Sequence, residues 1–379
     1  MTGNEVSAAV SSPSSSDQKL TLDSQVPVHM SSSAASGTDD MVASDSGKAF
    51  SIDESETAKT SAGKGRRTVY LCNTTAVEDI TDNFDSNNLI GLTQFGRLYR
   101  GKIERTGKET RFVTAKIWDE RADRFTYYLD KKTLMREEVK ILNHPSLKHP
   151  NLVKLMGGCF EKHVKAIIYD LYPLDTLHNY MSRDEFSWTQ RIKVALQFAR
   201  LVKFLHCQDD PYVIHNIDTT HIMLDEDCNP ILFDFGQISG GLIGPISREK
   251  EYAFMTTCYC DPHYIETGGH GHARVYHDVY SFGLILVELI TKRITSEDEI
   301  ISKGVKSTRK WVRGEHKPGY SLVCQSLRNQ AGYDPSDGLM ITQLAMDCIN
   351  DAPPKRPTIE TAVERLENLS VVKSHAGFY

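Results

Sequence analysis

Two charged residues that stand far apart in the chain have side chains suited to chemistry on phosphate groups. Lys116 lies in the run Arg111–Ile117, and Asp234 opens the tripeptide Asp234-Phe235-Gly236. An ammonium group pairs with phosphate oxygens as a point charge, and a carboxylate is the hard oxygen ligand that Mg²⁺ prefers. Side chains of these two types could hold a phosphate group and a magnesium ion if the fold brings them together.

The stretch from Val213 to Asp225 contains polar side chains of types that can accept protons or bind metals. It contains Asn216, Asp218 and His221. An asparagine amide does not titrate and cannot serve as a general base, and Mg²⁺ prefers oxygen to the nitrogen of an imidazole. Asp218 carries a carboxylate that could act as a base.

Two kinds of secondary structure must position these residues. Short β-like runs with glycine breaks come first, at Asn88–Gly91, Arg97–Gly101 and Arg111–Ile117. Longer apolar periodicities follow and predict helices at Thr133–Leu142, Gln190–His206, Val275–Thr291 and Gly338–Ile349. Strands followed by helices predict an α+β fold, in which a small sheet-rich lobe packs on a larger helical lobe.

Composition and charge exclude several classes of function. The net charge of -6 gives no reason to expect nucleic acid or an anionic membrane surface as a partner. None of the eight cysteines forms a C-x-x-C pair typical of zinc sites. The longest apolar stretch, Val279–Ile290, is too short to span a bilayer, so we expect no direct membrane insertion. These features favour a cytoplasmic protein, and peripheral association with the plasma membrane through partners stays open.

Several short segments in a fixed order identify a family. They are Ile80-Thr-Asp-Asn-Phe84, His149-Pro-Asn-Leu-Val153, Phe233-Asp-Phe-Gly236, Asp278-Val-Tyr-Ser-Phe-Gly283 and Arg356-Pro-Thr358. With these segments the chain resembles the plant receptor-like cytoplasmic kinases of the RLK/Pelle group. Its catalytic loop looks most like that of the subfamily XII pseudokinases, which serve as adaptors of an NLR immune receptor.

The resemblance implies a bilobal protein-kinase fold with a β-rich N-lobe and a larger helical C-lobe. We expect the N-lobe and hinge at residues 68–172 and the C-lobe at 173–369. Residues 370–379 would form a C-terminal tail. Residues 1–67 are rich in Ser, Thr, Ala, Asp and Gly with almost no aromatic residues, which predicts a disordered tail.

The resemblance also implies a nucleotide site, with ATP and Mg²⁺ as candidate cofactors. The implied nucleotide-binding residues are Ile90, Gly91, Gly96, Leu98, Lys116, Glu138, Tyr169, Leu171, Met223 and Asp234, and Asp234 is also the implied metal ligand. The glycine-rich loop carries Thr93 where the family has its second glycine, and a β-branched residue is stiff there. Two interpretations remain open, a weakened phosphate loop and a plain hairpin that never held ATP.

By the same comparison the catalytic residues have been lost. The family motif H-R-D-x-x-x-x-N places six residues between His and Asn, whereas five lie between His215 and His221. Alignment from the end of the loop puts Asn216 at the position of the base and His221 at that of the metal-binding Asn. Loss of a general base costs about 10²–10⁴ in rate. In an alternative alignment Asp218 would act as the base, one position late.

The first hypothesis is therefore a pseudokinase that acts as an adaptor or decoy in plant immune signalling. By resemblance its partners would be an NLR immune receptor and other cytoplasmic kinases or pathogen effectors. The alternatives are a low-activity serine/threonine kinase that uses ATP, Mg²⁺ and Asp218, and a nucleotide-gated switch without phosphate transfer. A further expectation concerns Arg356, whose family partner, a Glu, is replaced by His263; Arg356 would then face His263 or solvent.

Overall fold

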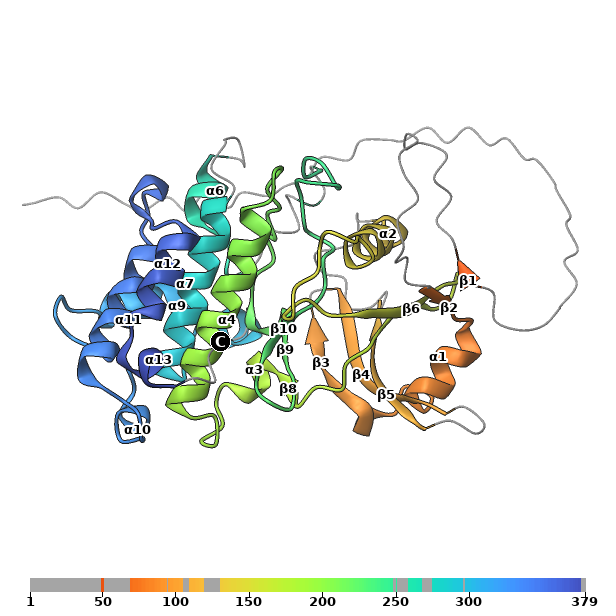
Figure 1. Ribbon diagram of the computed structural model, residues 1–379, viewed down its shortest axis with the longest axis horizontal. Coiled ribbons are helices and arrows are strands. Elements are labelled where there is room, and N and C mark those ends of the chain that lie inside the picture. The colour runs from red at the N-terminus through yellow and green to blue at the C-terminus, as the bar shows by residue number, and fades with distance from the viewer. Residues whose placement is uncertain are drawn as a thin grey trace, which may run out of the picture. The chain divides into compact units, whose positions relative to one another are not determined.

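The computed structural model describes residues 49–50, 69–93, 95–104, 109–118, 130–247, 250, 258–267, 275–295 and 297–375. They belong to one compact unit, Gly47–Tyr379. Within this unit the sheet-rich lobe and the helical lobe predicted from the sequence are both present (Figure 1). Apart from Ala49 and Phe50, residues 1–67 lie outside the described part of the chain, so their expected disorder stays a prediction.

The small lobe is built on a seven-stranded sheet with the order β1-β2-β6-β7-β5-β4-β3. The strands are β1 (Ala49–Phe50), β2 (Val69–Leu71), β3 (Leu89–Thr93), β4 (Gly96–Ile103), β5 (Arg111–Ile117), β6 (Leu155–Phe160) and β7 (Lys165–Tyr169). The pair β2–β6 is parallel, and the other pairs are antiparallel. The three strands predicted from the sequence are confirmed as β3, β4 and β5.

Two helices pack on this sheet, at different strands (Figure 1). Helix α1 (Thr74–Thr81) lies against β4 and β5, and helix α2 (Lys131–Leu142) lies against β6 and β7. Gly101 lets α1 approach closely, because a β-carbon there would lie 2.6 Å from a methyl carbon of Ile80. Alternation along β5 then sends Val113 and Ala115 toward Ile80 and Lys116 to the opposite face.

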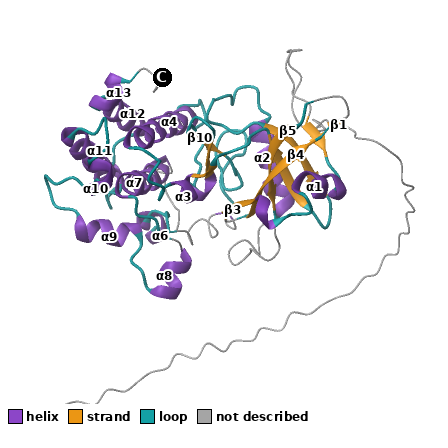
Figure 2. Cartoon of the chain, turned by 90° about the horizontal axis from the view of Figure 1, so that it is seen from below, coloured by secondary structure: helices purple, strands orange, loops and turns teal. Residues whose placement is uncertain are grey.

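The large lobe consists mainly of helices, which gather on one side of the strands in Figure 2. Its helices are α3 (Leu177–Tyr180), α4 (Trp188–His206), α6 (Pro262–Glu266), α7 (Val275–Thr291), α8 (Glu297–Lys303), α9 (Thr308–Glu315), α10 (Gln325–Arg328), α11 (Pro335–Cys348), α12 (Ile359–Glu367) and α13 (Ser370–Ser374). The most deeply buried is α7, which packs against α4 and α11. No helix in the described part of the chain has the length and apolarity that crossing a bilayer requires.

Shorter elements complete the structure. The 3₁₀ turns are η1 (Ser86–Asn88), η2 (Thr219–His221) and η3 (Pro353–Lys355), and a second, small sheet consists of β8 (Asp175–Thr176), β9 (Ile222–Leu224) and β10 (Pro230–Leu232). Helix α13 lies in the segment that the sequence suggested as a C-terminal tail. Its Val371 and Val372 are buried in the core of the helical lobe.

Asp278 at the start of α7 fixes the position of the catalytic loop. Its carboxylate accepts hydrogen bonds from the backbone N–H of Ile214 at 2.8 Å and of His215 at 2.9 Å, and His206 Nε2 lies 2.8 Å from it. Burial alone would raise the pKa of Asp278, but the hydrogen bond and charge of His206 lower it. The loop is thereby anchored to the most deeply buried helix of the lobe.

The expectation that Arg356 faces His263 or solvent is wrong. Both terminal nitrogens of the Arg356 guanidinium donate hydrogen bonds to Asp261, Nη1 to Oδ2 at 2.5 Å and Nη2 to Oδ1 at 2.8 Å. Both side chains are buried. His277 Nδ1 also lies 2.8 Å from Asp261 Oδ2. Burial would raise the pKa of Asp261, but hydrogen bonds from His277 and Arg356 lower it to about 2. A carboxylate two residues before His263 therefore replaces the absent Glu.

Glu288 on α7 is a buried carboxyl group with no cationic partner among the described contacts. It accepts hydrogen bonds from Tyr259 Oη at 2.7 Å and from Thr308 Oγ1 at 2.9 Å. Burial raises the pKa of Glu288 to about 8. The group is therefore mostly protonated at neutral pH, and it links α7 to α9 and to the segment before α6.

We predict that Arg356→Ala lowers the free energy of unfolding by about 3–5 kcal/mol, because it leaves the carboxylate of Asp261 buried without its cation. His263→Ala is the matched control and should change it by less than about 0.5 kcal/mol. Urea denaturation at pH 7 measures both. Since the pKa of Asp261 is about 2, the stability from this pair is lost only as the pH falls below the unfolded value of about 3.9. Equal losses in the two variants would contradict the assigned pair.

We also predict that Glu288→Gln gains stability over the wild type as the pH rises. The pKa of Glu288 is higher in the folded state than its unfolded value of about 4.3, so the wild type loses stability between that value and about pH 8. The amide keeps the shape of the neutral acid and does not titrate. The difference in unfolding free energy should grow by on the order of 1.4 kcal/mol per pH unit from pH 5 to 8. Parallel stability curves would show that Glu288 is not protonated in the folded state.

Candidate functional site

The structure brings Lys116, Glu138 and Asp234 together between the two lobes, as the sequence predicted. Lys116 Nζ donates to Glu138 Oε2 at 2.9 Å and to Asp234 Oδ1 at 2.5 Å, and all three side chains are fully buried. Burial raises the pKa of Glu138, and the charge of Lys116 offsets part of this effect. Tyr169 Oη donates to the other oxygen of Glu138. The lysine ammonium is therefore already neutralised by two carboxylates of the chain itself.

The three degenerate positions of the catalytic loop are occupied by local hydrogen bonds. Asn216 Nδ2 donates to the carbonyl of Asp234 at 3.3 Å. Asp218 is the N-cap of η2 and accepts from Thr220 N and Thr220 Oγ1, both at 2.6 Å, and from His221 N at 3.2 Å. His221 Nδ1 lies 3.0 Å from the second oxygen of Asp218. The carboxylate of Asp218 is thus directed into its own turn.

His221 stands beside the predicted metal ligand. Its Nε2 lies 3.5 Å from Asp234 Oδ2, and both side chains are fully buried. Burial alone would lower the pKa of His221, but the nearby charges of Asp218 and Asp234 raise it above the usual value. One oxygen of Asp234 thus faces Lys116 and the other faces an imidazole.

The predicted glycine-rich loop is the tight hairpin between β3 and β4. Thr93 Oγ1 accepts from Phe95 N at 3.2 Å and donates to the Gly96 carbonyl at 3.3 Å. Gly96 has φ +153°, and a β-carbon there would lie 2.0 Å from the Ile117 carbonyl oxygen, so glycine is required. The hairpin turns Phe95 inward, where its side chain is 1% exposed. Thr93 therefore stabilises the turn in place of the second glycine.

Two aromatic residues at this site were missed in the sequence. Phe95 lies with its ring centroid 5.7 Å from Lys116 Nζ, and the Trp118 ring lies 3.9 Å from the same atom. Trp118 is two residues after Lys116, and side chains two apart on a strand share a face. That spacing could have identified Trp118, whereas nothing in the sequence shows which way Phe95 turns.

The remaining residues predicted to bind nucleotide lie in the core or at the hinge. Ile90, Leu98 and Met223 are buried in the main core, and Leu171 is half-buried at the hinge. Thr114 Oγ1 donates a hydrogen bond to the Leu171 carbonyl at 2.8 Å. A side chain of strand β5 therefore already occupies this backbone acceptor of the hinge.

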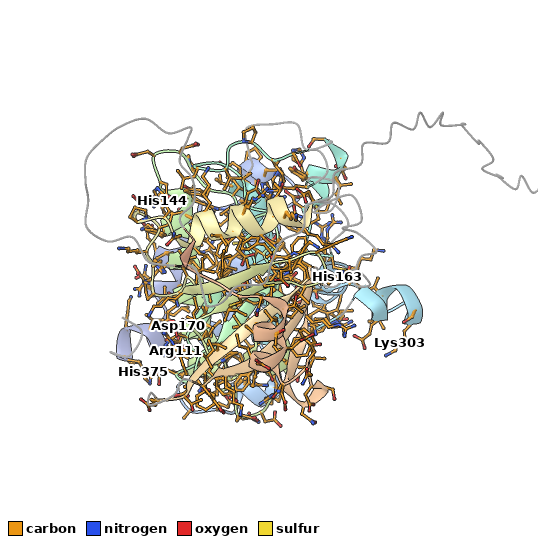
Figure 3. All side chains as sticks on the ribbon, turned by 90° about the vertical axis from the view of Figure 1, so that its right-hand side faces the viewer. Arg111, His144, His163, Asp170, Lys303 and His375 are labelled. Carbon is orange, nitrogen blue, oxygen red and sulfur yellow. The ribbon has the colours of Figure 1, made fainter. Side chains whose placement is uncertain are left out.

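An ion pair at the surface fixes the hinge further. Arg111 Nε donates to Asp170 Oδ1 at 3.1 Å and Nη2 to Oδ2 at 2.5 Å. Figure 3 shows the two residues side by side.

These residues do not fit Mg²⁺–ATP as they are arranged. Of the ten predicted nucleotide-binding residues, eight are buried among side chains of the chain, and Gly91 and Leu171 are half-buried. In nucleotide sites Mg²⁺ is held by one or two carboxylates together with phosphate oxygens and waters, and the candidate carboxylate here, that of Asp234, already accepts a hydrogen bond from Lys116. Lys116 and Asp234 are paired with each other instead.

Comparison with known proteins agrees with the fold and with part of the sequence-based resemblance. The family model of protein tyrosine and serine/threonine kinases matches residues 84–366. The chain is 31% identical over 304 residues to the probable serine/threonine-protein kinase PBL15 of Arabidopsis thaliana, covering 78% of this chain and 69% of that protein. It is 30% identical to the EPD1-interacting receptor-like cytoplasmic serine/threonine-protein kinase of Nicotiana benthamiana, and the match covers 77% of this chain and 62% of that protein. The serine/threonine-protein kinase PBS1 of Arabidopsis thaliana is also 30% identical, with coverage of 76% and 62%.

Among solved structures, the apo GRMZM2G135359 pseudokinase matches 86% of this chain and all of its own, with a TM-score of 0.53 and 17% sequence identity. That likeness concerns the fold alone. Together with the matched family model and the bilobal architecture, the relatives show that this chain belongs to the protein tyrosine and serine/threonine kinase family and is homologous to plant receptor-like cytoplasmic kinases.

Proposed function

We propose that this protein is a pseudokinase, which uses the kinase fold to bind other proteins and does not transfer phosphate at a useful rate. It would act as an adaptor or decoy in plant immune signalling. The observation that carries the proposal is the set of hydrogen bonds made by Asp218, the residue that the alternative alignment offers as the general base. Its carboxylate accepts hydrogen bonds within its own turn and lies beside His221, so it is not directed at a substrate hydroxyl.

The partners and the compartment belong to the same proposal. The resemblance to the subfamily XII pseudokinases suggests an NLR immune receptor, other cytoplasmic kinases or pathogen effectors as partners. One relative is named for its interaction with EPD1 and another is PBS1, and both are kinases by name. The protein would act in the cytoplasm and reach the plasma membrane through such partners.

The second candidate function is a low-activity serine/threonine kinase. The observation that favours it is the intact Lys116–Glu138 ion pair, which a phosphate-transferring kinase also needs. Asp234, the candidate metal ligand, lies next to this pair. This candidate requires two rearrangements. Lys116 would have to release Asp234, and Asp218 would have to leave the N-cap of η2.

We predict that the purified protein shows no phosphate transfer from radiolabelled ATP to a generic protein substrate. Loss of the general base lowers turnover about 10²–10⁴-fold from typical kinase values of roughly 1–100 per second. The replacement of the metal-binding Asn by His221 and the pairing of Lys116 with Asp234 lower it further, to background. Asp234→Asn is the matched control, because it retains an oxygen toward Lys116 and removes the metal carboxylate. Wild type and variant should give the same background signal.

A wild-type signal that disappears in Asp234→Asn would support the enzyme instead. Asp218→Asn would then show whether Asp218 is the base, since the amide keeps the oxygen that accepts from the turn.

A further inference from the structure

We propose that Phe95 is an internal substitute for the nucleotide: it fills the phosphate end of the cleft and holds the two lobes closed. This inference deepens the proposed function and rests on it, because a protein that works by binding can do without ATP. It goes further in stating that nucleotide is excluded and in naming the group that excludes it.

The Phe95 ring lies between residues of the two lobes. It comes from the β3–β4 hairpin of the small lobe, yet its neighbours belong to both lobes. The ring centroid lies 6.2 Å from that of His221 in the catalytic loop, and a β-carbon on Gly236 would lie 3.6 Å from Phe95 Cε2. Lys116 of β5 is the neighbour on the small-lobe side. One aromatic side chain therefore packs against both walls of the cleft.

The ammonium group of Lys116 is enclosed by its partners. Its side chain is 0% exposed. Two carboxylates accept its hydrogen bonds, and the faces of Trp118 and Phe95 lie over the ammonium at 3.9 and 5.7 Å. A phosphate group would have to displace an aromatic ring and separate the Lys116–Asp234 pair before it could reach this cation.

Contacts between the lobes also close the mouth of the cleft. Asn179 of α3 donates through Nδ2 to the Ile90 carbonyl at 2.8 Å, which ties the large lobe to strand β3. Strand β3 also contacts β8 and η2 directly. Leu98 from the small lobe and Met223 from the large lobe are both fully buried behind this contact. The two lobes are thus in direct contact at strand β3 as well as at Phe95.

The competition between Phe95 and a nucleotide is uneven. The ring is tethered beside its site, so its effective concentration there is on the order of millimolar or higher. ATP would also have to expose the apolar surface that the ring now buries. We therefore expect the closed arrangement to persist at millimolar ATP.

The first experiment compares Phe95→Ala with Leu92→Ala by thermal unfolding. Leu92 lies in the same hairpin but is 62% exposed, so it controls for effects on the turn. Removal of a buried Phe should lower Tm by at least about 6 °C, and removal of the exposed Leu by less than about 2 °C. Equal shifts would overturn the proposal.

A loss of Tm alone would also follow from ordinary core packing, so a second readout follows access to the cleft. An amine-reactive reagent with detection by mass spectrometry should label Lys303, whose side chain is 67% exposed, and leave Lys116 unlabelled in the wild type. Labelling of Lys116 should rise at least about tenfold in Phe95→Ala and stay unchanged in Leu92→Ala. Rapid labelling of Lys116 in the wild type would overturn the proposal. If Phe95→Ala does not fold, Phe95→Leu takes its place, with a smaller rise in labelling expected.

The third readout uses ATP itself, with and without Mg²⁺, at millimolar concentration. The wild type should show no increase in Tm, because a ligand that binds the folded state would stabilise it. An ATP-dependent increase without phosphate transfer would overturn this inference and leave the proposed pseudokinase intact. Phosphate transfer that depends on Asp234 would instead overturn the proposed function. The two failures are therefore distinguishable.

Discussion

The contact on which this structure depends is the pairing of one buried ammonium, that of Lys116, with the carboxylates of Glu138 and Asp234. A buried charge without a partner is very costly, so the three side chains have to stay together. Glu138 comes from helix α2, Lys116 from β5 and Asp234 from the segment after β10. The pairing therefore fixes the helix against the sheet and the small lobe against the large one.

The same pairing is central to the proposal that this chain keeps the kinase fold without transferring phosphate. In an active kinase the lysine and the aspartate act on phosphate and metal, whereas here each neutralises the other. The shortened catalytic loop adds His221 beside Asp234 and directs Asp218 into a 3₁₀ turn. Asp278 anchors that loop, and Asp261 pairs with Arg356 in place of the family's Glu. The scaffold contacts are retained, while the groups that would act on a substrate make structural contacts.

Long, strongly patterned elements could be predicted from the sequence. Val275–Thr291 and Arg111–Ile117 were expected with the bounds that α7 and β5 have, because a continuous buried helix and a regular central strand have clear apolar patterns. The gathering of Lys116, Glu138 and Asp234 followed from family motifs. The partner of Arg356 did not, because Asp261 is 95 residues away and only packing brings the two together. The inward turn of Phe95 was also beyond sequence reasoning, since it depends on hydrogen bonds of Thr93 within the hairpin.

The most direct test of this account is a crystal structure of the protein from crystals grown with millimolar ATP and Mg²⁺. We predict that Phe95 packs between Lys116 and Gly236, that Lys116 stays paired with Asp234, and that no nucleotide lies in the cleft. A nucleotide bound between Leu98 and Met223, with Phe95 displaced and Lys116 on its phosphates, would contradict the account.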